Sequence, residues 1–220
     1  CFGGAGPTWF REGTAELLST HSGQGQRIEV NRVPFDRKQV PYWGRFKRMA
    51  QLRERSSIPT LNAVMRYQPD LRGDVGVYGW SWAAAMMLYA YPDSQPALLA
   101  AARLGRENDE NFNDQLRQRL SSQWPALAAR WRLTCHDLDY GFDWSREKVS
   151  LSTGDPVWTG QPIRLQIDAN QGWQSIGVRI PRGKSLRITP SGQVTLASQP
   201  KPWISHSPGI TFRYYRGRPL

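Results

Sequence analysis

One run of side chains, residues 75–89, constrains the fold more than any other part of the sequence. The run reads VGVYGWSWAAAMMLY and contains no charged residue. Placed on a helix, these side chains are apolar on nearly all faces, which is typical of a helix buried in the interior of a domain. We therefore predict that residues 75–89 form such a helix.

Helical signals continue on both sides of this run, from Thr8 to about Leu138. Apolar residues recur at the spacing of a helix face in three further segments. They are Phe46, Met49 and Leu52; Phe112, Leu116 and Leu120; and Leu127 with Trp131. Apart from residues 28–33, which we predict as a short strand, this part of the chain is expected to be all-α.

The character of the sequence changes near residues 139–143. From Pro156 onward apolar residues alternate with polar ones and turn residues separate the runs, which is typical of a β-sandwich or barrel. The alternating residues are Ile163, Leu165 and Ile167; Ile176, Val178 and Ile180; and Leu186 with Ile188. Residues 169–188 resemble the opening strands of a bacterial galactose-binding-lectin type of β-sandwich, which implies an accessory module that is incomplete here.

The segment from Pro7 to Leu18 reads PTWFREGTAELL. It sets Glu12 in the first turns of an apolar-faced helix, next to Gly13, where a metal-bound partner can approach closely. A carboxylate is a plausible zinc ligand at such a place, because a catalytic zinc takes three protein ligands and keeps one position open for water. An ordinary amphipathic helix with Glu12 on its surface is the alternative.

These residues resemble the second half of the zinc signature of gluzincin metallopeptidases of the aminopeptidase-like kind. In that family a helix with H-E-x-x-H is followed by a helix reading W-x-x-E-G-x-A-E. The resemblance implies that Glu12 is the third protein ligand of Zn²⁺. The histidines of this chain, His21, His136 and His206, form no H-E-x-x-H. We therefore expect the two histidine ligands upstream of Cys1, and Zn²⁺ to bind only when they are present.

Two further residues are candidates for the site, Tyr78 from the same resemblance and Glu16 from its position on the helix. Tyr78, at the start of the buried run, corresponds to a tyrosine that donates a hydrogen bond to the oxyanion of the tetrahedral intermediate, a task that suits a neutral phenol. It is followed by Gly79 and Trp80, where a lysine and a glycine are usual. Glu16 lies one turn after Glu12 on the same helical face, which makes it a candidate acceptor for orienting a zinc-bound histidine supplied from upstream. The alternatives are a tyrosine buried for packing and a solvated helix charge.

The formal net charge of +11 permits binding to acidic polymers, membrane surfaces or nucleic acid. Five of the cations lie in one predicted helix, where they would form its solvated face: Arg45, Lys47, Arg48, Arg53 and Arg55. No nucleic-acid motif accompanies them, so nucleic acid is disfavoured. No apolar stretch reaches the roughly 18 residues of a transmembrane helix. Localisation stays open, with a secreted or cell-envelope location favoured. Cys1 and Cys135 allow one disulfide at most, and the sequence does not decide whether they pair.

The sequence thus predicts an α+β chain in two parts. Residues 1–143 are the helical part of a gluzincin-like peptidase domain, and residues 144–220 are a truncated β-rich accessory domain. The predicted function is that of a fragment of a zinc-dependent peptidase, which acts on a peptide or protein substrate and is inactive alone because its histidine ligands are missing. The alternative is a non-catalytic surface or adhesion protein that binds glycans or acidic polymers through the β module and the basic helix.

Overall fold

The computed structural model describes residues 6–25, 27–68, 73–103, 109–152, 154–198, 203–206, 214–215 and 218–219. The chain groups into two compact units. The first contains Cys1–Asp155 together with Asn170–Gly177, and the second contains Pro156–Ala169 and Val178–Leu220. The domain boundary at residues 143 and 144 stays a prediction.

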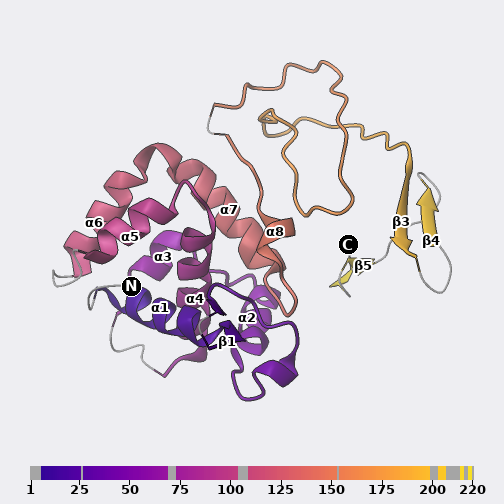
Figure 1. Cartoon of the computed structure of the whole chain (residues 1–220). Helices are drawn as coiled ribbons and strands as arrows, with labels where there is room; N and C mark the ends of the chain where they lie inside the picture. The colour runs from indigo at the N-terminus through magenta and orange to yellow at the C-terminus, as the bar shows by residue number, and fades with distance from the viewer. Residues whose placement is uncertain are drawn as a thin grey trace. The chain divides into compact units, whose positions relative to one another are not determined.

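The first unit is built mainly of helices (Figure 1). They are α1 Thr8–Ser19, α2 Arg45–Glu54, α3 Leu61–Met65, α4 Val75–Ala90, α5 Gln95–Arg103, α6 Asp109–Arg119, α7 Trp124–Asp137 and α8 Trp144–Glu147, with the 3-10 turns η1 Arg37–Gln39 and η3 Ser121–Gln123. An antiparallel hairpin, β1 Ser22–Gln24 and β2 Arg27–Glu29, follows α1. The predicted strand at 28–33 is therefore shorter and begins one residue earlier.

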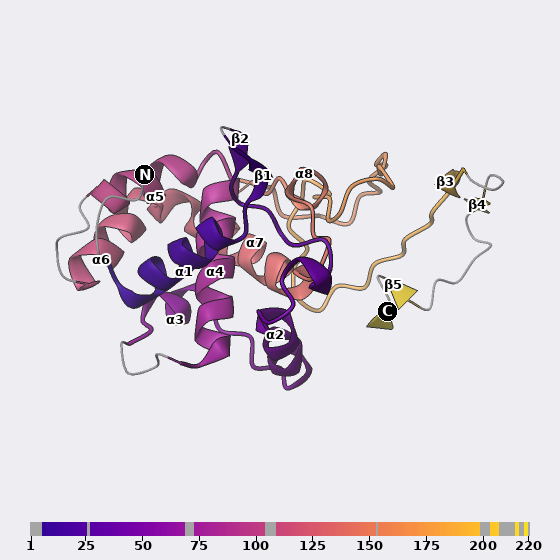
Figure 2. The ribbon, with the colours of Figure 1, turned by 60° about the horizontal axis from the view of Figure 1, so that its bottom comes forward.

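Helix α4 lies at the centre of this unit (Figures 1 and 2). Every residue from Gly76 to Leu88 is buried except Tyr78. Helices α1, α2, α3, α5 and α7 all pack against α4. Its first turn is capped by the carboxylate of Asp74, which accepts a hydrogen bond from the N–H of Gly76 at 2.7 Å. The prediction of a helix buried on all faces is confirmed.

Helices α1 and α4 cross closely because α1 has a glycine at the crossing. A Cβ atom at Gly13 would overlap the carbonyl oxygen of Ser81 and would lie 3.1 Å from the Cβ of Ala85. The backbone of α1 therefore rests directly on α4. On the same helix, the side chains of Trp9 and Leu17 are fully buried in the core.

The other helices bury the apolar faces that their spacing predicts. Phe112, Leu116 and Leu120 are buried on α6 or directly after it, as are Leu127 and Trp131 on α7 and Phe46 and Met49 on α2. Leu52 packs against the core from a partly buried position. Within the described residues, no helix combines the length and the apolarity that crossing a bilayer requires.

The second unit contains two small antiparallel pairs. β3 Gln193–Ala197 pairs with β4 Trp203–His206, and β5 Tyr214–Tyr215 pairs with β6 Arg218–Pro219. Helices together with these two-stranded sheets make the chain α+β in the coarse sense.

The three predicted strands with alternating apolar residues are wrong. The described residues from 154 to 192 contain only an isolated bridge between Val157 and Arg179. Alternation marks a face that a strand could bury, but burial needs a second layer to cover it. The described residues leave the first of these runs largely uncovered, since Ile163, Leu165 and Ile167 remain 42%, 44% and 59% exposed.

The substitution Gly13→Ala tests the crossing of α1 and α4. We expect a loss of about 1–3 kcal/mol in the free energy of unfolding, because the added methyl group would push α1 away from the backbone of α4. The measurement is urea unfolding followed by circular dichroism.

Ala15→Ser, on the exposed side of the same helix, serves as the control and should change the free energy by no more than about 0.5 kcal/mol. Helix propensity alone favours alanine over glycine, so an unchanged or raised stability for Gly13→Ala would show that the crossing is not tight.

Candidate functional site

The three residues singled out by the sequence lie on the two helices that cross. Glu12 and Glu16 are on α1, and Tyr78 is in the first turn of α4. The structure brings Glu16 and Tyr78 together through one shared partner, the guanidinium group of Arg45. Among the described residues it records no hydrogen bond or ion pair between Glu12 and either of them.

The carboxylate of Glu16 is engaged at both oxygens. Its Oε1 forms an ion pair with Arg45, and its Oε2 accepts a hydrogen bond from Trp43 Nε1 at 2.6 Å. The side chains of Arg45 and Glu16 are only 19% and 14% exposed. Glu16 therefore fastens α1 to the start of α2. Orienting a zinc-bound histidine stays a predicted role of Glu16. Such a histidine would donate its ring N–H to a carboxylate oxygen that already accepts from Arg45 or Trp43.

Tyr78 has a hydroxyl group that can still donate. The oxygen accepts a hydrogen bond from the N–H of Gly73 at 3.3 Å, which uses a lone pair and leaves the proton free. The Arg45 guanidinium lies 5.3 Å from the centre of the Tyr78 ring, and Tyr78 is half-buried. Within the described part of the chain the hydroxyl proton has no acceptor.

The two residues after Tyr78 are fixed by packing. A Cβ atom at Gly79 would lie 2.9 Å from the sulfur of Met49, so α2 approaches α4 at this position. Trp80 is buried, and its ring meets that of Trp131 edge-on with centres 6.2 Å apart. A side chain at position 79 would therefore have to displace that of Met49.

Glu12 is in a different environment from Glu16. Its side chain is half-buried, and within the described residues it makes no hydrogen bond or ion pair. On the helix it lies beside Ala15 and Ser19, which are exposed and follow it at spacings of three and seven residues. The described residues contain no group of three or more His, Cys, Asp or Glu side chains that could hold a metal ion.

A separate polar cluster joins residues 170–177 to α7 and α8. Trp173 Nε1 donates to the buried carboxylate of Asp137, whose other oxygen lies 2.8 Å from Nδ1 of His136. The N–H of Gly172 donates to the carbonyl oxygen of Arg146 at 2.8 Å. No signal in the sequence indicates this contact, because Trp173 lies in a segment whose resemblance to a β-sandwich predicts a strand. The cluster holds the loop in place.

A cavity of about 370 Å³ lies at the N-terminal end of α1. It is lined by Pro7, Met65, Arg66, Tyr67 and Arg117 among others, and it includes neither Glu12 nor Tyr78. Burial is the main cause that raises the pKa of the Tyr67 phenol to about 12, and the nearby charges of Asp74 and Cys135 add to it.

Comparison with known proteins adds no assignment. No family model, no curated protein and no solved structure matches the chain. The function has to be inferred from the residues of the site themselves.

Replacing Arg45 tests the link between α1 and α2. We expect Arg45→Met to lower the free energy of unfolding by about 1–3 kcal/mol, because it leaves the carboxylate of Glu16 largely buried without its cation. The measurement is chemical denaturation at neutral pH.

The matched control is Arg32→Met, which breaks an ion pair with Glu29 whose side chains are 56% and 60% exposed. Solvent screens such a pair, so the change should stay within about 0.5 kcal/mol. Equal effects of the two substitutions would contradict the structural role given to Arg45.

The raised pKa of the Tyr67 phenol predicts how the free energy of unfolding changes at alkaline pH. Below pH 10 the phenol is protonated in both states, whereas between pH 10 and about 12 only the unfolded chain ionises, so stability falls as pH rises. Tyr67→Phe removes this contribution and should make the fall shallower, measured as urea midpoints across that range. Cys135 and Tyr91, whose pKa values burial also raises, leave a residual slope. Identical slopes for parent and variant would refute the assignment.

Proposed function

We propose that this chain is the second half of a zinc-dependent peptidase domain of the gluzincin type, with Glu12 as a metal ligand and Tyr78 as the donor to the oxyanion. The state of Glu12 is the observation that carries the proposal. Helix α1 has two acidic residues, and the structure uses only Glu16 to hold the fold together. Glu12 is half-buried and makes no hydrogen bond or ion pair within the described residues, so its oxygens are available to a cation.

The crossing of α1 and α4 supports a shared site for Glu12 and Tyr78. Glu12 precedes Gly13, which rests on Ser81 of α4. Tyr78 precedes Ser81 by three residues, which is slightly less than one helical turn. Both side chains thus begin within about one turn of the crossing point. Glycine next to the candidate ligand and tyrosine near the start of the facing helix are the features that the gluzincin resemblance calls for.

The chemistry needs two more ligands than the described residues supply. Glu12 provides one oxygen donor, and we propose that two histidines come from sequence outside residues 1–220. A zinc ion held by these three groups would supply a water molecule whose pKa is lowered toward neutrality. Tyr78 would then donate its free hydroxyl proton to the oxygen of the tetrahedral intermediate, where negative charge develops.

The decisive measurement is the zinc content of the longer polypeptide that includes the coding sequence preceding Cys1. We expect tight binding of one zinc ion per chain in the parent, and a content well below one in Glu12→Ala, because the loss of a ligand opens the site. Glu54→Ala, which removes an exposed glutamate on α2, is the matched control and should retain the zinc.

Tyr78→Phe in the same polypeptide separates metal binding from catalysis. It should retain the zinc and lower the turnover of a peptide substrate by roughly 100- to 1000-fold, the usual cost of losing one oxyanion donor. Tight zinc in Glu12→Ala, or an upstream sequence without H-E-x-x-H, would exclude this proposal.

A further inference from the structure

Six side chains between residues 35 and 48 are exposed or half-exposed and are here called the basic face: Phe35, Arg37, Lys38, Tyr42, Lys47 and Arg48. Asp36 is the only acidic residue in this segment, and its carboxylate accepts hydrogen bonds from the backbone N–H groups of Lys38 and Gln39 at 2.8 and 3.3 Å. The Asp36 carboxylate is therefore already hydrogen-bonded to the backbone of η1.

The four cations of the basic face have no ion-pair partner among the described residues, although neighbouring arginines do. Arg32 pairs with Glu29 and Arg45 pairs with Glu16. Arg37, Lys38 and Lys47 are exposed, and Arg48 is half-exposed. The positive charge of this surface is therefore not neutralised within the part of the chain that the structure describes.

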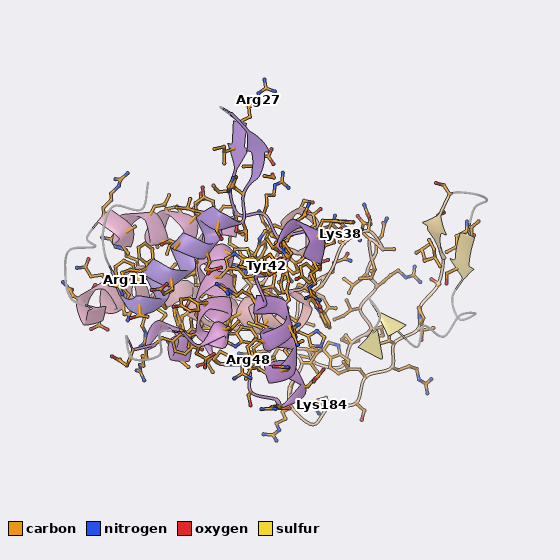
Figure 3. The ribbon with its side chains drawn as sticks, turned by 90° about the horizontal axis from the view of Figure 1, so that it is seen from below. Arg11, Arg27, Lys38, Tyr42, Arg48 and Lys184 are labelled. Atoms are coloured by element: carbon orange, nitrogen blue, oxygen red, sulfur yellow. The ribbon has the colours of Figure 1, made fainter. Side chains whose placement is uncertain are left out.

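The same segment of the chain carries two aromatic side chains that are largely exposed. Phe35 is 73% exposed and Tyr42 is 98% exposed. The view from below shows Lys38, Tyr42 and Arg48 on the side of the molecule formed by η1 and α2 (Figure 3). Phe46 and Met49, on the opposite side of α2, are buried in the core. A solvated helix face explains the cations but not the two exposed rings.

We propose that the basic face docks on membrane surfaces that contain anionic lipid. Cations near such a surface are attracted by the headgroup charge, and aromatic rings are favoured at the level of the headgroups. A phenylalanine ring has no polar atom, so it gains from the apolar boundary of a bilayer and less from a hydrated acidic polymer. Cations and rings on one surface match a peripheral contact of this kind.

The size of the expected effect follows from the number of cations. Each Lys or Arg near an anionic leaflet changes partitioning by about fivefold, so removing two should weaken it by about 25-fold and reversing them by more. The attraction is screened by salt, whereas the contribution of the rings is not.

The test uses the whole 220-residue chain and sedimentation with vesicles of phosphatidylcholine, with or without phosphatidylserine. We expect binding only to the vesicles with phosphatidylserine, and a loss of at least about 25-fold in the double variant Lys38→Glu with Lys47→Glu. Tyr42→Ser should weaken binding even at high salt. The matched control, Arg119→Glu with Arg132→Glu, reverses two exposed cations of α6 and α7 and should bind like the parent.

Three outcomes would overturn the proposal. An equal loss in the control variant would mean that only net charge matters. Binding to heparin or to duplex DNA but not to the vesicles would identify an acidic polymer as the partner. Binding to phosphatidylcholine alone, unaffected by the charge reversals, would exclude anionic headgroups. None of these results depends on zinc, so they leave the peptidase proposal untouched.

Discussion

The close contact between α1 and α4 is the constraint on which the rest of the first unit depends. Helix α4 is apolar on all faces, so it is stable in water only when other helices surround it. Gly13 lets the backbone of α1 reach the carbonyl of Ser81, and this short distance brings Trp9 and Leu17 into the core. The same contact positions α1 relative to α2, so that the carboxylate of Glu16 reaches Arg45.

The helices could be predicted from the sequence because their signals are local. The spacing of Phe112, Leu116 and Leu120 requires one face of a helix to be buried, whichever neighbour covers it. A strand differs, because alternation defines its face but pairing depends on a partner distant in the sequence. Ile163, Leu165 and Ile167 alternate without such a partner, so the pattern indicated strands that the structure does not contain.

The sequence selects candidate residues for a site but does not predict their contacts. The resemblance selects Glu12 and Tyr78, and helical spacing adds Glu16. Arg45, however, is 29 residues from Glu16 in sequence, and nothing local distinguishes it from the other arginines. The two glutamates are separated by about 6 Å along α1 and by about 40° around it, as follows from helix geometry. That offset turns Glu16 toward the start of α2 and leaves Glu12 without this cation.

The arginines of the first unit divide according to what the fold uses them for. Arg45, Arg53 and Arg130 have side chains that are 19%, 9% and 8% exposed, and each forms an ion pair with a carboxylate. Arg53 also donates to the carbonyl oxygens of Cys135 and Leu138 at the end of α7, and Arg130 lies over the ring of Tyr91. These three connect helices that are far apart in sequence. The exposed cations of the basic face form no ion pair with another described residue, and their mutual repulsion opposes folding slightly. Their charge therefore acts on the surroundings of the protein and not on its core.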